Sequence, residues 1–161
     1  MSTGKTIEKS KTKSDSWRTP PYFYDPLNAE FNFDFDPCPY NEGEILPEND
    51  GLLIEWGQRN FVNPPYSIKL RTAFIEKAVA ESKKGKLCVL LLPVLGTATK
   101  LFHDIIVPNL SEPIRFVRRR IKFMRLNDQG EWEGDKSPFH DSMLVIFDGR
   151  AAGCSAKNNG A

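Results

Sequence analysis

The chain has 161 residues, of which 40% are hydrophobic and 27% charged, so it fits one domain and is neither a disordered nor a collagen-like protein. Its net charge of +1 excludes a global electrostatic attraction to nucleic acid, so any basic contact surface must be local. Three widely spaced cysteines and two separated histidines predict no disulfide scaffold and no metal site, and the lack of a long apolar run or a secretory signal predicts a cytoplasmic protein without a membrane partner.

Both ends of the chain are polar. Residues 1–16 carry four lysines and almost no apolar side chains, which predicts a flexible basic N-terminal tail. Such a tail either contacts phosphate groups or only improves solubility, and a few lysines without aromatic residues favour the second interpretation. Residues 150–161 are mostly small and polar and predict a second flexible tail. We therefore expect one domain over residues 17–149.

The domain is expected to begin with a helix and a short strand. A proline-rich segment, residues 17–24, precedes a predicted helix over residues 25–31 that has Pro26 in its first turn. The sequence FNFDFD, residues 31–36, alternates aromatic and polar side chains and therefore predicts a strand. Residues 39–50 read as a polar loop.

The middle of the chain predicts strands and helices in alternation. Residues 60–63 form a second short strand, which two prolines end. Residues 68–84 have the apolar stripe of an amphipathic helix. Residues 87–92 are apolar without interruption, as expected of a central parallel strand covered on both faces. Residues 97–107 predict another helix.

Residues 114–124 and 143–147 predict a late antiparallel strand pair. The order of strands and helices predicts an α/β domain whose sheet is mostly parallel before this pair. Ligands of such domains bind at the carboxyl ends of the strands. Two predicted strands end in chemically suggestive sequences, Asp36-Pro37-Cys38 and Asn63-Pro64-Pro65-Tyr66.

The second of these sequences can orient a planar amino group for attack on a methyl donor. The amino nitrogen of a base is a poor nucleophile because its lone pair is delocalised into the ring. The side-chain oxygen of Asn63 and the carbonyl oxygen of Pro64 can accept its two N–H bonds, which favours a pyramidal nitrogen, and the two prolines fix the turn. Tyr66 offers a flat face on which an extruded base can stack. The alternative is an ordinary proline turn after a strand.

Two aspartates are further candidates for ligand contacts. Asp36, at the end of the first strand, can accept hydrogen bonds from ribose hydroxyls or from an ammonium group. Asp50, in the sequence Asp-Gly-Leu, can accept one from an adenine amino group. The alternative for both residues is a structural aspartate that caps a turn.

The densest basic cluster lies in the predicted late strand. Its members are Arg115, Arg118, Arg119, Arg120, Lys122 and Arg125. In a strand, Arg118 and Arg120 would point to one side and Arg119 to the other. The cluster is interpreted either as a phosphate-contacting edge beside the site or as a solvated edge strand whose charge resists aggregation.

An ordered series of motifs resembles a known family. The series comprises Trp17-Arg18-Thr19-Pro20, Phe35-Asp36-Pro37-Cys38, Asp50-Gly51-Leu52 ahead of Trp56, Phe61-Val62-Asn63-Pro64-Pro65-Tyr66-Ser67, Leu90-Leu91-Leu92-Pro93, and Ser137-Pro138-Phe139 with Ser142-Met143-Leu144-Val145. Over residues 17–148 the chain resembles the small Dam-like DNA N6-adenine methyltransferases of bacteriophages and prophages. The Asn-Pro-Pro-Tyr tetrapeptide alone is shared with cytosine-N4, RNA and protein-glutamine methyltransferases.

The resemblance implies a compact Rossmann-like methyltransferase fold, S-adenosylmethionine as methyl donor, and double-stranded DNA as substrate in a bacterial host cell. It assigns catalysis to Asn63, Pro64, Pro65 and Tyr66, and cofactor contacts to Thr19, Pro20, Asp36, Pro37, Cys38 and Asp50. DNA contacts are expected from Ser67, Arg118, Arg119, Arg120 and Lys122. A homodimer is one way in which so small a chain would cover its substrate.

Two features depart from the wider methyltransferase pattern. The sequence that begins at Asp36 stands where a glycine-rich cofactor loop is usual, and the stretch from Asp36 to Asn63 is short for two strand–helix units. Two alternatives therefore stay open. One is methylation of another amino acceptor (cytosine N4, an RNA base or a protein glutamine), and the other is a catalytically inactive relative that only binds nucleic acid.

Overall fold

The computed structural model describes residues 16–136 and 138–150. The two expected tails, residues 1–16 and 150–161, lie outside the described residues except for Ser16 and Arg150. The helices are α1 (Pro21–Phe31), η1 (Pro47–Asn49), α2 (Ile68–Lys83), η2 (Leu101–Ile106) and α3 (Val107–Asn109), and the strands are β1 (Arg59–Val62), β2 (Leu87–Pro93), β3 (Arg115–Phe116), β4 (Met124–Leu126), β5 (Trp132–Gly134) and β6 (Ser142–Asp148). None of the described helices is long and apolar enough to cross a membrane.

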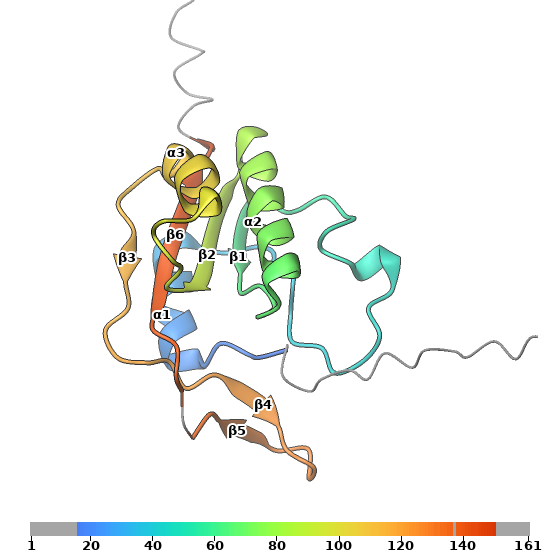
Figure 1. The fold of residues 1–161 in the computed structure, drawn as a ribbon. Helices are drawn as coiled ribbons and strands as arrows, with labels where there is room; N and C mark the ends of the chain where they lie inside the picture. The colour runs from blue at the N-terminus through green and yellow to red at the C-terminus, as the bar shows by residue number, and fades with distance from the viewer. Residues whose placement is uncertain (1–15, 137, 151–161) are drawn as a thin grey trace, which may run out of the picture.

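The main sheet has four strands in the order β1-β2-β6-β3 and is mixed (Figure 1). β1 and β2 are parallel, whereas β6 runs antiparallel to both β2 and β3. The expected late antiparallel pair is therefore present as β3 and β6. Only one of the three strand pairs in the described sheet is parallel, however, so the sheet is mixed rather than mostly parallel. A buried apolar run such as β6 has the same pattern in both directions, so hydrophobicity alone cannot reveal strand direction.

The first helix is longer than predicted, and the strand after it is shorter. α1 begins at Pro21, because a proline suits a first helical position where the missing N–H is not needed. The helix ends at Asn32, which has a left-handed φ of 53°. The strand predicted over residues 31–36 is reduced to a single parallel bridge between Phe35 and Asn60, because the helix and its left-handed end take up the first two of these residues.

The helix predicted over residues 97–107 is present in part and is wider than an α-helix. η2 is a π-helix, and the N–H of Val107 donates to the carbonyl of Phe102, five residues earlier. Pro108 follows in α3, and in a regular α-turn its ring would clash with the carbonyl four residues before it. The wider π-turn accommodates the proline without that clash.

The strand predicted over residues 114–124 is split by a bend. Its start, β3, pairs with β6, whereas its end, β4, pairs with β5 in a separate hairpin that lies below the main sheet in Figure 1. Arg119, between the two pieces, has a left-handed φ of 69°, a conformation that regular strands do not contain. The expectation that Arg118 and Arg120 share one face of a strand is therefore wrong, since neither residue lies in a strand.

Helices cover both faces of the main sheet (Figure 1). One face packs against α2 and η2 through side chains such as Phe74 and Ile106. The other face packs against α1, whose Leu27 is buried there. Residues 87–92 of β2 are buried, and their side chains alternate between the two hydrophobic clusters. The prediction of a central strand covered on both faces is therefore confirmed.

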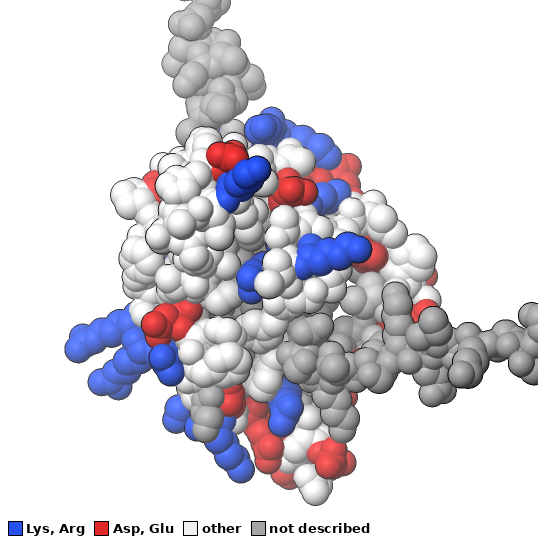
Figure 2. Space-filling model, viewed as in Figure 1, with Lys and Arg blue, Asp and Glu red and all other residues white. Residues whose placement is uncertain are grey.

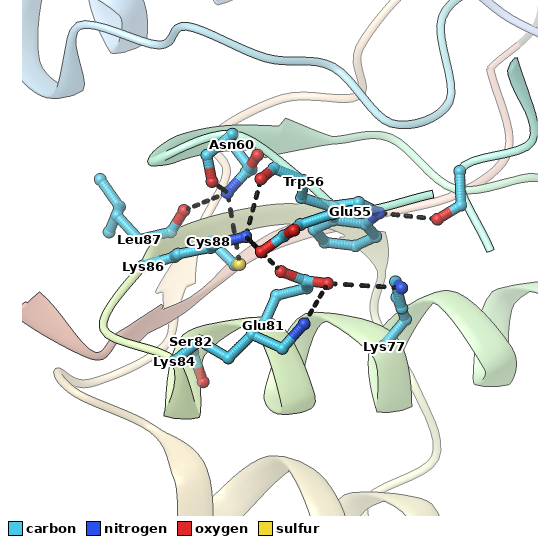
Figure 3. A network of polar contacts seen from close by, with 12 residues as sticks. Glu55, Trp56, Asn60, Lys77, Glu81, Ser82, Lys84, Lys86, Leu87 and Cys88 are labelled. Atoms are coloured by element: carbon cyan, nitrogen blue, oxygen red, sulfur yellow. Dashed lines mark hydrogen bonds and ion pairs between the residues drawn. The ribbon is translucent and has the colours of Figure 1, made fainter. Parts of the chain in front are cut away.

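A buried ion-pair network lies at the amino ends of β1 and β2 (Figure 3). Glu81 of α2 and Lys86 are 1% and 4% exposed, and Lys86 Nζ lies 2.6 Å from Glu81 Oε2. Lys86 Nζ also donates to the carbonyl oxygen of Trp56 at 2.7 Å. Lys77 and Lys84 each lie 3.3 Å from the other Glu81 oxygen. The network joins α2 to the sheet at the end remote from the carboxyl ends of β1 and β2.

Candidate active site

The carboxyl ends of the parallel segments bring the two predicted motifs together. β1 ends at Val62, so Asn63 follows at the edge of the sheet. Asp36 follows Phe35, which bridges in parallel to Asn60 of β1. Residues that follow neighbouring parallel segments meet at one edge of a sheet, the usual ligand-binding edge of α/β domains.

Cys38 connects the two motifs directly. Its N–H donates to Asp36 Oδ1, and its thiol donates to the carbonyl oxygen of Asn63, both at 3.0 Å. Desolvation, together with the charge of Asp36, raises the pKa of the Cys38 thiol well above its usual value. The thiol therefore stays protonated and continues to donate, which fixes the turn at Asp36 to the turn at Asn63.

The side-chain amide of Asn63 is held by the N-terminal segment. Its Nδ2 donates to the carbonyl oxygen of Trp17 at 3.2 Å and to Thr19 Oγ1 at 3.3 Å. Both N–H groups of the amide are therefore engaged, and its oxygen has no partner among the described residues. Within the same part of the chain the carbonyl oxygen of Pro64 has no partner either. Two acceptors that have no donor among the described residues thus follow β1.

The two predicted cofactor aspartates have different surroundings. Asp36 keeps access to solvent, but the protein around it raises its pKa to about 6 by desolvation, against a smaller lowering by the hydrogen bond from Cys38. Its Oδ2 has no hydrogen-bond partner in the described part of the chain. Asp50 accepts the N–H of Leu52 at 2.9 Å, which is the turn-capping role considered as its alternative.

Gly51 lets the loop after Asp50 approach the first motif closely. A Cβ atom at Gly51 would lie 1.9 Å from the carbonyl oxygen of Pro37, a separation that no side chain can adopt. Trp56 Nε1 donates to the carbonyl oxygen of Gly51 at 2.6 Å and holds the loop in place. The loop therefore supports the turn that carries Asp36.

An aromatic cavity of about 240 Å³ opens beside the Asn-Pro-Pro-Tyr turn. It is lined by Trp17, Tyr66, Ile121, Phe123, Asp135, Pro138, Phe139 and His140. Tyr66 stacks on His140, with ring centroids 5.4 Å apart and ring planes inclined by 22°, and meets Phe123 edge to face. Burial, together with the charge of Asp135, raises the pKa of Tyr66 to about 12, so its ring is neutral. Flat apolar walls of this kind suit a planar heterocycle.

Basic residues between β3 and β4 flank this cavity. Arg118, Arg119 and Lys122 are exposed, and Figure 2 shows Lys and Arg side chains projecting from this part of the surface, at the lower left of the view. Ile121 and Phe123 are buried and line the cavity. The segment therefore presents charge outward and apolar side chains inward.

Arg120 differs from its basic neighbours because its guanidinium is engaged within the chain. It donates to Asp141 Oδ1 at 3.1 Å and to the carbonyl oxygen of Pro138 at 3.3 Å. The two contacts lie on either side of residues 139–140 in the sequence, and His140 stacks on Tyr66. Arg120 therefore holds one wall of the cavity.

The remaining predicted site residues lie at helix starts. Ser67 is the half-buried residue before α2 and makes no capping hydrogen bond with its side chain. Pro20 is buried and precedes α1. Across residues 16–136 and 138–150, no three His, Cys, Asp or Glu side chains lie close enough together to hold a metal ion.

Sequence reasoning missed most of the cavity wall. The sequence motifs include Trp17 without giving it a role, and they predict no role at the site for Ile121, Phe123 or His140. The alternation of basic and apolar residues around Ile121 was a usable signal for two of them. His140 reaches Tyr66 through tertiary contacts, for which the sequence holds no local pattern.

An α/β domain with an Asn-Pro-Pro-Tyr turn after a strand, next to an aromatic cavity, is compatible with a methyltransferase that acts on amino groups. The chain belongs to the DNA N-6-adenine-methyltransferase (Dam) family, whose sequence model it matches over residues 6–157. The match covers nearly the whole chain, so the resemblance to Dam-like proteins is confirmed. No curated protein and no solved structure is significantly similar to the chain.

Proposed function

We propose that the protein transfers a methyl group from S-adenosylmethionine to the N6 amino group of adenine in double-stranded DNA, and that its domain is a compact Rossmann-like one. Family membership supports the reaction class. The observation that carries the proposal is the pair of acceptors, Asn63 Oδ1 and the Pro64 carbonyl oxygen, which have no partners in the described part of the chain and belong to the same turn as Tyr66, a residue of the cavity wall.

The four residues of the turn have complementary roles in this proposal. Asn63 Oδ1 and the Pro64 carbonyl accept the two N–H bonds of adenine N6, which directs the nitrogen lone pair toward the methyl group. Pro65 stiffens the turn, so the acceptors are in position before the base arrives. Tyr66 stacks on the base after it has left the duplex. S-Adenosylmethionine, when bound, supplies a methyl group already activated by its sulfonium. The proton that N6 must lose after methylation is released to water.

The residues around Asp36 fit the chemistry of this donor. S-Adenosylmethionine carries an ammonium group and ribose hydroxyls, which donate hydrogen bonds to a carboxylate, and a sulfonium, whose positive charge a carboxylate attracts. Asp36 offers a solvent-accessible oxygen without a partner among the described residues. In the proposal, the turn of Asp36, Pro37 and Cys38 holds S-adenosylmethionine. Asp50 Oδ2, the carboxylate oxygen that does not cap the turn, contributes a second acceptor.

Duplex DNA is proposed to lie over the basic surface between β3 and β4. Arg118, Arg119 and Lys122 are exposed beside the cavity, where they would contact phosphates on either side of an extruded base. Ser67, at the start of α2, would contact a phosphate through its hydroxyl and the helix N-terminus. Arg120 would act through its hold on the loop of His140.

The direct test is transfer of labelled methyl groups from S-adenosylmethionine to phage and bacterial DNA, followed by nucleoside analysis of the product. N6-methyladenine in the digest is the expected result. N4-methylcytosine would overturn the choice of base. If the folded protein transfers no methyl group, the proposed reaction is wrong. If S-adenosylmethionine also fails to raise the melting temperature, the proposed methyl donor is wrong too.

Replacing Tyr66 with alanine is expected to weaken DNA binding much more than donor binding. A base–aromatic stack contributes about 1–3 kcal/mol, so the KM for DNA should rise by roughly fivefold or more. Tyr66→Phe keeps the ring and is the matched control, expected to behave like the unchanged protein. Steady-state kinetics with DNA and calorimetry with S-adenosylmethionine measure the two affinities. Equal loss of both would contradict a stacking role.

The affinity for S-adenosylmethionine is expected to fall as the pH is lowered through about 6, the raised pKa of Asp36. Only the ionised carboxylate of Asp36 accepts hydrogen bonds from S-adenosylmethionine with full strength, so protonation of Asp36 competes with the binding of S-adenosylmethionine. The dissociation constant should rise by up to roughly tenfold at about pH 5, one unit below this pKa. Asp36→Asn, which cannot ionise, should bind weakly at neutral pH and show a flat profile. The same slope in both proteins would assign the titration to another group.

A further inference from the structure

We propose that Thr19 is a positioning residue for Asn63: its hydroxyl, together with the Trp17 carbonyl, holds the Asn63 amide so that the amide oxygen and not the amide nitrogen meets the adenine amino group. This inference rests on the proposed function, because it gives Thr19 a role in the same reaction. It differs from the cofactor contact that the family resemblance implies for Thr19.

The need for such a residue follows from the symmetry of the amide. The oxygen and the NH2 group of asparagine have nearly the same shape, and rotation by half a turn exchanges them. Only an acceptor can bind an N–H bond of adenine, so the exchanged orientation would turn two donors toward the substrate and oppose binding. A productive Asn63 therefore requires surroundings that distinguish oxygen from nitrogen.

The Trp17 carbonyl makes that distinction because it can only accept, whereas the Thr19 hydroxyl accepts the second contact and fixes where the amide lies. The Trp17 carbonyl oxygen and Thr19 Oγ1 both face Nδ2, at 3.2 Å and 3.3 Å. In the exchanged orientation the amide oxygen would face the Trp17 carbonyl, and two acceptors would be in contact. The Trp17 carbonyl thus favours the orientation that turns the oxygen away from the N-terminal segment, and the Thr19 hydroxyl holds the amide in that orientation.

Thr19 is itself held from both sides. Arg18 exchanges backbone hydrogen bonds with Met124 of β4, at 2.8 Å and 2.9 Å. Pro20 is buried, and its carbonyl accepts the first hydrogen bonds of α1. The branched side chain of Thr19 has few rotamers, so the position of its hydroxyl is determined by a backbone that is fixed on either side. A hydroxyl fixed in this way holds the amide in place before the substrate arrives.

The test compares Thr19→Val, which keeps the shape and removes the hydroxyl, with Thr19→Ser, which keeps the hydroxyl. Thr19→Val is expected to lower kcat for DNA methylation by roughly threefold to tenfold, the effect of one hydrogen bond. Its affinity for S-adenosylmethionine, measured by calorimetry, should stay within about twofold of the unchanged protein. Thr19→Ser should restore most of kcat. Thr19→Ala is measured beside them, so that a failure of the valine variant to fold does not decide the result.

A second readout separates this inference from the proposed function. The side-chain NH2 signals of Asn63 in a 15N-labelled protein, assigned by their absence in Asn63→Ala, should shift in Thr19→Val and return in Thr19→Ser. Shifts of this kind in a protein that transfers no methyl group would support the contact while overturning the proposed function. Unchanged NH2 signals together with unchanged kcat would overturn the positioning role. Weaker donor binding at unchanged kcat would overturn it too and assign Thr19 to the cofactor.

Discussion

Alanine at position 63 is expected to lower the rate of methyl transfer to DNA by about a hundredfold to a thousandfold, the loss typical when one hydrogen-bond partner of a transition state is removed. Without the amide oxygen, adenine N6 keeps only the Pro64 carbonyl as acceptor, and its lone pair is no longer directed at the methyl group. The fold should survive, because Asn63 is half-buried and lies beyond the last residue of β1. Single-turnover kinetics and circular dichroism measure the two quantities.

Asn63→Asp is the informative companion of this variant. Aspartate retains an acceptor oxygen but loses both donors, so its carboxylate would face the Trp17 carbonyl that now accepts from the amide. Its activity should therefore lie between those of the alanine variant and the unchanged protein. Full activity of Asn63→Ala would contradict the proposed role, and an aspartate variant as slow as the alanine variant would show that the acceptor alone is insufficient.

The central part of the site could be predicted from the sequence because it follows from local rules. A motif that follows a strand lies at its carboxyl end, and neighbouring parallel segments put such motifs at one edge. Asp36 and Asn63 meet for this reason, although the strand before Asp36 is only a single bridge. The buried central strand, β2, was equally predictable, since its uninterrupted apolar run admits few other environments.

The rest of the site depends on contacts between distant residues. Arg120 looked like a phosphate contact by charge, but its position is set by Asp141, which only the returning chain brings near. His140 stacks on Tyr66 for the same reason. The left-handed Arg119 redirects the chain from the main sheet into the β4–β5 hairpin, and arginine carries no signal for such a conformation. The hydrophobic pattern of a sequence indicates which residues are buried. It does not indicate the contacts of Arg120 and His140 or the conformation of Arg119, which depend on how distant segments pack.

Lys86→Met is expected to reduce the free energy of unfolding by about 3–5 kcal/mol, the usual effect of removing one partner of a buried ion pair. The substitution leaves Glu81 almost fully buried, with its Oε2 deprived of the lysine that lies 2.6 Å away (Figure 3). Lys77 and Lys84 still reach the other oxygen, which favours the lower end of this range. Urea unfolding followed by tryptophan fluorescence measures the change, with substitution of Lys83, the exposed last residue of α2, by methionine as the matched control.

The origin of this effect can be separated from a simple loss of packing. If an unpaired buried carboxylate is responsible, then Glu81→Leu combined with Lys86→Met should recover much of the lost stability, because an apolar pair needs no charge compensation. Desolvation alone would raise the pKa of Glu81, but hydrogen bonds from Lys86, Lys84 and Lys77 outweigh it and lower the pKa below its ordinary value of 4.5. The unchanged protein should therefore lose this contribution as the pH falls through the lowered pKa. In Lys86→Met the carboxyl protonates more readily, so the difference between the two proteins should shrink in acid. A difference that stays constant with pH, or additive losses in the double variant, would assign the effect to packing instead.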